Sequence, residues 1–197
     1  NDFSIDGEND DDNIWDDFDF DYNQLLKDAK KLSTKQVLHQ RTGSGNNYKK
    51  AEEGDEITLQ TYKLSLYKTP AVKDLPETKR IVAQCKRLFD AIGSKDNDIL
   101  LLEYDENCFL GWHIDNPPEA DLGRINIVVT DNWKESPIVF RECNEFTVSC
   151  PAKLAVVNSY RYEHMYDNRG KGKRILLCMT THDLNYDEVK NAVSKRI

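Results

Sequence analysis

Two histidines and one aspartate carry the most distinctive chemistry in this sequence. Within "GWHIDNPP" (111–118), His113 and Asp115 are two residues apart. In an extended segment, this spacing places both side chains on one face. Such a pair can bind a metal, form a hydrogen bond or simply end a strand. His164, in a strand-like segment far downstream, completes a set of two imidazoles and one carboxylate. On a small barrel, that set leaves about three metal positions open and suits non-haem Fe(II).

A fourth candidate follows the second histidine at a spacing that fits a hairpin. Arg174 comes ten residues after His164, and Gly170 and Gly172 lie between them. Across such a turn, Arg174 would begin the adjacent strand and point into the cavity beside His164. A guanidinium in that position can grip a terminal carboxylate through two hydrogen bonds. The alternative is an ordinary salt-bridged residue at a sheet edge.

The combined pattern resembles the Fe(II)- and 2-oxoglutarate-dependent oxygenases. In that family, an H-x-D pair and a distant histidine bind iron, and a basic residue holds the 5-carboxylate of 2-oxoglutarate. The resemblance implies iron ligation by His113, Asp115 and His164, with Arg174 as the co-substrate clamp. It also implies a double-stranded β-helix, a jelly-roll or cupin-like fold, over about residues 98–181. The implied reaction uses O₂, hydroxylates an unactivated C–H bond and releases succinate and CO₂.

Two further segments resemble particular branches of this superfamily. "GRINIVVTDN" and "AVVNSYRYEHMYDN" are similar to the aspartyl/asparaginyl β-hydroxylase-like and the amino-acid (proline) hydroxylase-like members. Arg124 and Asn126 alternate along the first segment and would both face the cavity as substrate contacts. Thr180 stands where base-repair members carry a second arginine, and Arg174 stands where collagen-type prolyl hydroxylases carry lysine. Both of those branches are therefore disfavoured.

The substrate class is left open by these residues. A free amino acid, a protein side chain or another small polar metabolite fits, so a small-molecule or peptidyl substrate is expected. Arg124 would suit a substrate carboxylate. The main rival is a cupin-like metal-binding protein without oxygenase turnover, and a metal-dependent isomerase or hydrolase on the same barrel is a further alternative. Arg174 discriminates against the metal-binding protein, since a simple metal-holding barrel needs no carboxylate clamp. Zinc in place of iron, with no effect of 2-oxoglutarate on thermal stability, would favour the isomerase or hydrolase.

The elements that must position these residues change in character along the chain. Apolar spacing predicts one helix, or two short ones, over 22–40, and a helix over 76–92 that Gly93 ends. From residue 98 onward, short apolar or alternating runs separated by turn residues predict an antiparallel sandwich or barrel. These runs are 98–106, 124–131, 136–143, 145–150, 152–159, 162–167 and 174–181. A closing helix is expected over 185–195.

Length and composition indicate one globular domain. The chain has 197 residues, of which 39% are hydrophobic and 31% are charged. Residues 1–21 contain ten acidic and no basic side chains, which predicts a flexible N-terminal segment. Interleaved among the acids, Ile14, Trp15, Phe18 and Phe20 leave open that the segment anchors on the domain or on a partner. We expect a single dioxygenase-like domain over 22–197, with a helical lead-in over 22–93 and a β core over 98–181.

Charge and cysteine usage limit the partners and the location. A net charge of −8 argues against broad binding to a nucleic-acid backbone, which needs a basic face. No apolar run is long enough to span a membrane. The five cysteines are odd in number and show no paired C-x-x-C spacing, so we expect reduced thiols in the cytoplasm. Nothing in the sequence predicts an oligomeric state.

Overall fold

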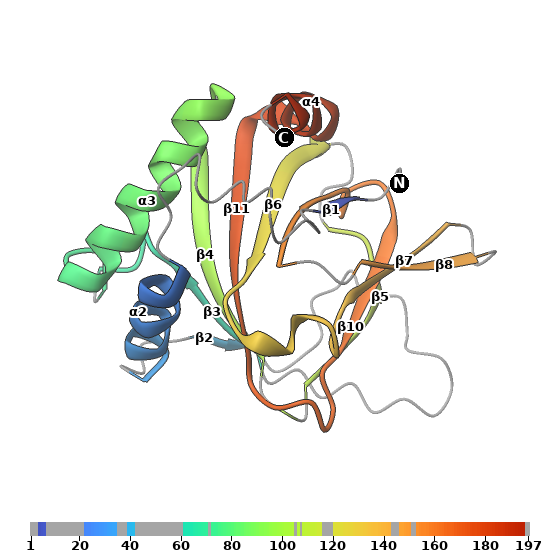
Figure 1. Ribbon diagram of the computed structural model, residues 1–197, viewed down its shortest axis with the longest axis horizontal. Helices are drawn as coiled ribbons and strands as arrows, with labels where there is room; N and C mark the ends of the chain where they lie inside the picture. The colour runs from blue at the N-terminus through green and yellow to red at the C-terminus, as the bar shows by residue number, and fades with distance from the viewer. Residues whose placement is uncertain are drawn as a thin grey trace.

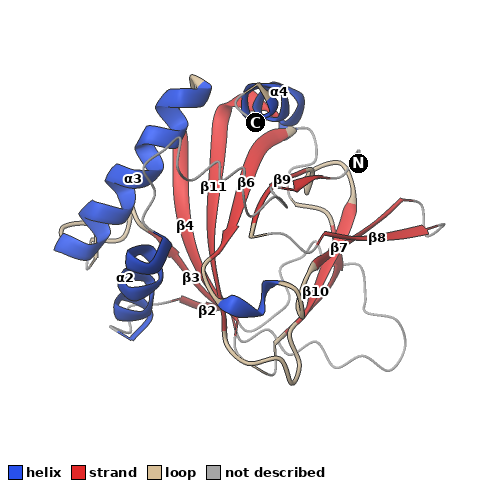
Figure 2. Ribbon diagram, viewed as in Figure 1, coloured by secondary structure: helices blue, strands red, loops and turns tan. Residues whose placement is uncertain are grey.

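The protein is described here from a computed structural model (Figure 1). The structure describes residues 4–6, 22–34, 39–41, 61–70, 72–104, 106, 108–115, 120–142, 146–150 and 153–195. Within these ranges the chain forms helices on one side of a large antiparallel sheet, and a smaller antiparallel sheet lies on the other side (Figure 2). The predicted class, mainly β with flanking helices, is therefore confirmed.

Helix α3 (Pro76–Ile92) occupies the range that the apolar spacing predicts. Pro76 fits the first turn because its missing N–H would have no helical partner there. Gly93 ends the helix in the left-handed conformation, at φ 84°, which a residue without a side chain adopts easily. The residues that face the sheet recur every three or four positions: Thr78, Ile81, Cys85, Leu88, Phe89 and Ile92 are all buried.

Helix α2 (Tyr22–Thr34) is shorter than the predicted 22–40 range. Leu25, Ala29 and Leu32 are fully buried and pack in the same core as α3. An ion pair between Asp28 and Arg80 joins the two helices. Residues 39–41 were expected to be helical at least in part, but they form strand β2, because they pair with another strand instead of extending α2.

The larger sheet contains seven antiparallel strands in the order β1-β9-β6-β11-β4-β3-β2. Strand β11 lies in the middle and pairs with β6 on one side and with β4 on the other. The strands are β1 (Ser4–Asp6), β2 (His39–Arg41), β3 (Thr61–Ser65), β4 (Asn97–Tyr104), β6 (Leu122–Val128), β9 (Leu154–Val157) and β11 (Arg174–Asn185). Because β11 begins at Arg174, the central position of this strand in the sheet also determines where this candidate site residue lies.

The smaller sheet has four antiparallel strands in the order β5-β10-β7-β8. Its strands are β5 (Phe109–His113), β7 (Ile138–Glu142), β8 (Phe146–Cys150) and β10 (Glu163–Asp167). Strand β10 pairs with both β5 and β7. The β5–β10 pair brings the H-x-D segment next to the segment of the downstream histidine.

Alternation along β11 divides the buried residues into two cores. Ile175, Leu177 and Met179 face the helices and belong to the larger core. Leu176 faces the smaller sheet, together with Phe140 from β7 and other residues of both sheets. The pocket-forming side chains therefore lie between two sheets, while helices stabilise the opposite face of the larger one.

The segment boundaries differ from the sequence expectations in physically understandable ways. Strand β11 continues to Asn185, four residues past the expected end, and short helix α4 (Tyr186–Ser194) follows directly. Within the expected helical lead-in, β2 and β3 are strands that extend the sheet beyond β4. Ser4–Asp6 forms edge strand β1 on β9, whereas the remainder of the acidic segment lies outside the described residues. A 3-10 turn, η2 (Asp131–Trp133), follows β6.

Among the described residues, no helix has both the length and the apolar character needed to cross a membrane.

Candidate active site

The three proposed metal ligands meet between the two sheets. His113 ends β5, and its backbone pairs directly with that of His164 on β10. Their imidazole rings are 4.1 Å apart between centroids, and both side chains are buried. Asp115 follows β5, and its backbone N–H donates to the carbonyl of Ser159 at 2.9 Å. One possible ligand atom from each of the three residues lies within 4.8 Å of the others, an arrangement that could hold a metal ion.

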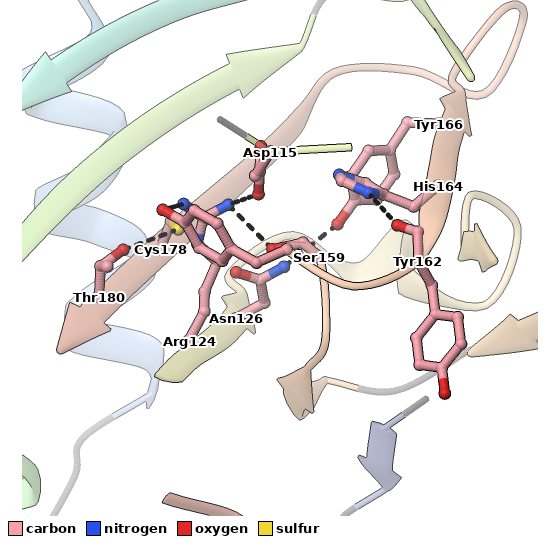
Figure 3. Close-up of polar contacts among 10 residues, drawn as sticks. Asp115, Arg124, Asn126, Ser159, Tyr162, His164, Tyr166, Cys178 and Thr180 are labelled. Carbon is pink, nitrogen blue, oxygen red and sulfur yellow. Dashed lines mark hydrogen bonds and ion pairs between the residues drawn. The ribbon is translucent and has the colours of Figure 1, made fainter. Parts of the chain in front are cut away.

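Backbone carbonyls orient both imidazoles. His113 Nδ1 lies 2.7 Å from the carbonyl oxygen of Gly111. His164 Nδ1 lies 3.3 Å from the carbonyl oxygen of Tyr162, as Figure 3 shows. A carbonyl oxygen can only accept, so Nδ1 carries the hydrogen in each ring. In this tautomer Nε2 carries the lone pair with which an imidazole can bind a metal, and ligand histidines usually have their other nitrogen held by the protein in this way.

Electrostatics keep the three groups in the protonation states that a metal requires. Burial, together with the neighbouring His113, lowers the pKa of His164 to about 3. Burial also lowers the pKa of His113. Burial raises the pKa of Asp115, but the Arg124 charge and the two imidazoles outweigh it, so this pKa is well below its usual range. At neutral pH the set is therefore two neutral imidazoles and one carboxylate, which are the forms that bind metals.

Arg124, on β6, points at the carboxylate of Asp115. Its Nη1 forms an ion pair with Oδ2 of Asp115 and donates to Ser159 Oγ at 3.3 Å (Figure 3). Its Nη2 donates to the Tyr160 hydroxyl at 3.1 Å. Arg124 was predicted to contact substrate, and the structure places it within the pocket but with its fork directed at these three groups. A substrate role for it stays a prediction.

Arg174 begins β11 and is almost completely buried, with 2% of its surface exposed. Its Nε and Nη1 have no hydrogen-bond acceptor within the described part of the chain. The guanidinium lies 4.9 Å above the ring of Tyr166, and Tyr104 is its backbone partner on β4. Burial lowers the pKa of Arg174. A buried cation with unused donors is costly, and an anionic group that accepts from them would remove that cost. The residues present therefore fit a carboxylate.

Several pocket residues were not singled out by sequence reasoning. Tyr166 is two residues after His164 on β10, so strand alternation could have placed it on the same face. Asn126, which was predicted, is buried and donates from Nδ2 to the Tyr166 hydroxyl at 3.3 Å. Cys178 lies opposite Asn126 in the β11–β6 pair. Ser159 sits in a turn with no periodic signal, and only the structure identifies it.

No protein-family model matches this chain, and no curated protein matches it in sequence.

Solved structures, in contrast, are similar along most of the chain. A prolyl hydroxylase from Trichoplax adhaerens, in complex with a hypoxia inducible factor oxygen degradation domain peptide fragment, matches with a TM-score of 0.61 and 12% identity. The match covers 86% of this chain and 80% of that one. A Pseudomonas putida prolyl-4-hydroxylase gives a TM-score of 0.56 and 11% identity over 81% and 84% of the two chains.

A third match catalyses a different kind of reaction. The non-heme alpha ketoglutarate dependent epimerase of nogalamycin biosynthesis gives a TM-score of 0.52 and 13% identity, covering 90% of this chain and 75% of that one. The chain thus shares its fold with two prolyl hydroxylases and with an alpha-ketoglutarate-dependent epimerase.

Proposed function

We propose that this protein is an Fe(II)- and 2-oxoglutarate-dependent oxygenase. One observation carries the proposal: two kinds of group lie together between the sheets. The first is the cluster of His113, Asp115 and His164, and the second is the buried guanidinium of Arg174, whose Nε and Nη1 find no acceptor among the described residues. The first group suits a divalent metal with open positions. The second suits a carboxylate at a distance from that metal. We also propose that the two sheets form a double-stranded β-helix, which the likeness to prolyl hydroxylases supports.

Each residue has a defined part in the proposed reaction. His113, Asp115 and His164 hold the iron, and Arg174 binds the far carboxylate of the diacid through charge-assisted hydrogen bonds. Tyr166, whose ring lies under the guanidinium and whose hydroxyl is held by Asn126, fixes the direction of Arg174. When bound, iron would catalyse the oxidation of a C–H bond by O₂, and this oxidation is coupled to the conversion of 2-oxoglutarate into succinate and CO₂. The protein excludes water by burying both histidines and Arg174.

The proposed substrate is an amino acid, a protein side chain or a small polar metabolite. The Trichoplax protein was solved with a peptide fragment, which supports a peptidyl substrate as one candidate. The epimerase supports a reaction outcome other than hydroxylation as a second candidate. A location in the cytoplasm is part of the proposal, and the free thiols of Cys85, Cys108 and Cys178 support it.

The test is succinate release by protein loaded anaerobically with Fe(II) and 2-oxoglutarate and then given O₂ with a panel of amino acids and peptides. This readout does not depend on whether the product is an alcohol. We expect substrate-dependent succinate that His113→Ala and Asp115→Ala abolish. The rival metal-binding protein would bind the ion without any effect of 2-oxoglutarate on its thermal stability. Succinate formation that persists in both variants would remove the proposed ligand roles.

A further inference from the structure

The ion pair between Arg124 and Asp115 places a fixed positive charge beside a proposed metal ligand. Three contacts hold the guanidinium: the Asp115 carboxylate, Ser159 Oγ at 3.3 Å and the Tyr160 hydroxyl at 3.1 Å. Its carbon atom Cζ lies 5.1 Å from the centre of the Tyr160 ring. The Arg124 and Asp115 side chains are only 15% and 20% exposed, so solvent screens the pair weakly. The charge is therefore a permanent part of the site.

We propose that Arg124 serves as an internal counter-cation that stabilises the metal-free pocket and lowers its affinity for divalent metal ions. This inference rests on the proposed function. In the metal-free pocket, Arg124 neutralises a carboxylate that would otherwise be partly buried without a counter-ion, a state that costs stability. When a divalent ion binds, the same guanidinium repels it. Such a pocket remains stable without metal, but its affinity for a divalent ion is lower than the affinity of the same three ligands without Arg124.

Counting charges shows why the dicarboxylate matters. With neutral histidines, the pocket contains one negative charge, Asp115, and two positive charges, Arg124 and Arg174, so it carries a net charge of +1. A divalent ion raises this to +3, and a dianionic co-substrate returns it to +1. Metal binding and diacid binding should therefore strengthen each other, because the bound ion adds positive charge that attracts the diacid, and the bound diacid offsets the positive charge that repels the ion.

Two opposing effects of removing Arg124 must be compared. Loss of a residue that orients a metal ligand typically weakens metal binding by about 10- to 100-fold. Removing a unit positive charge that lies one ligand away from a divalent ion strengthens metal binding by roughly 1000-fold, at the effective dielectric constant of about 20 that suits partly buried sites. The charge effect is the larger of the two. We expect the neutral variant to bind metal about 10- to 100-fold more tightly than the wild type.

Three variants separate charge from orientation. Arg124→Gln removes the charge but keeps an N–H donor, and Arg124→Lys keeps the charge with a different donor geometry. Arg161→Gln is the matched control, because Arg161 is exposed and paired with Asp121 and Asp187 at the surface. The dissociation constant of Mn(II) is measured by calorimetry, without O₂ or substrate. Arg124→Gln should bind about 10- to 100-fold more tightly. The lysine variant keeps the charge and should bind no more tightly than the wild type, and the control should match the wild type.

Folding of the variants is followed in the same samples by circular dichroism and thermal unfolding. Metal-free Arg124→Gln should unfold at a lower temperature than the wild type and gain more on adding Mn(II). If it is unfolded without metal, the Mn(II) concentration that restores the fold gives its affinity. A folded Arg124→Gln protein that binds Mn(II) no more tightly than the wild type overturns the inference.

The coupling to the diacid is measured with N-oxalylglycine, an unreactive 2-oxoglutarate mimic. It should increase Mn(II) affinity more in the wild type than in Arg124→Gln, since the wild-type pocket has the greater charge excess to relieve. An equal increase in both proteins argues against the counter-cation role. If the mimic has no effect on either protein, the proposed oxygenase function fails, but the comparison of Mn(II) affinities still decides the role of Arg124.

Discussion

Replacement of Arg174 by methionine should have opposite effects on the empty pocket and on the filled one. In the empty pocket, Arg174 is 2% exposed, and its Nε and Nη1 find no acceptor among the described residues. A buried donor left without a partner costs about 1–3 kcal/mol. Methionine has no such donors and a flexible, apolar side chain that can fill the space. The free energy of unfolding of the ligand-free protein should therefore rise by about 1–3 kcal/mol.

In the filled pocket the same change removes the proposed carboxylate clamp. A hydrogen bond to a charged group contributes about 1.5–3 kcal/mol, so two of them contribute about 3–6 kcal/mol. Since about 1.4 kcal/mol corresponds to a ten-fold change, affinity for the diacid should fall by about 10²- to 10⁴-fold. Affinity for the metal alone should not fall, because Arg174 is not one of the proposed ligands and carries a positive charge.

Two measurements on the same protein check these expectations. Urea denaturation without ligands gives the free energy of unfolding, and calorimetry with N-oxalylglycine and Mn(II) gives the diacid affinity. Arg169→Met is the control, because Arg169 lies in the same hairpin but is exposed and paired with Asp167. If Arg174→Met is less stable than the wild type and binds the diacid equally well, then Arg174 is a structural residue of the hairpin and the reasoning is refuted.

Three further predictions concern stability. Gly123→Ala should lower the free energy of unfolding by about 1–3 kcal/mol, because the added Cβ would collide with Val189 and lie 2.9 Å from the backbone oxygen of Asn185; urea denaturation with an unchanged midpoint would contradict this. Asn185→Ala should cost about 1 kcal/mol by removing the cap on the Glu188 N–H at the start of α4, seen as a lower denaturation midpoint with the same slope. Finally, the free energy of unfolding of the metal-free protein should fall as the pH drops below about 6.5, by up to ~1.4 kcal/mol per pH unit. The reason is that His164 is protonated in the unfolded chain at a higher pH than in the folded protein, where its pKa is about 3. Denaturation at pH 7 and pH 5 should show a smaller loss in His164→Gln, and equal losses would argue against a buried neutral imidazole.

The sequence was sufficient to predict which residues form the candidate site, but not how those residues contact one another. Strand alternation and the H-x-D spacing were enough to nominate His113, Asp115 and His164, which the structure brings together. The Arg124–Asp115 ion pair was not predictable, because it joins residues of two different sheets. Its geometry depends on how these sheets pack, and a single sequence carries no local signal for that packing.

The fold was predictable where a local pattern determined it. Helix α3 matches its predicted range because Pro76, the apolar stripe and Gly93 all act within one segment. The short strands β2 and β3 were missed because three to five residues show little periodicity. Their stability depends on pairing with other strands, β2 with β3 and β3 with β4. For the same reason the sequence did not reveal β1, which pairs with β9 in the part of the chain that the structure describes.

The division of the pocket between the two sheets has a mechanical consequence. Both imidazoles belong to the smaller sheet, through β5 and β10, whereas both guanidiniums project from the larger one, through β6 and β11. A metal ion and a diacid held together would thus act as a removable cross-link between two layers of the domain. Backbone amides of β5 and β10 should exchange with deuterium more slowly once both ligands are present, although neither ligand touches most of those amides.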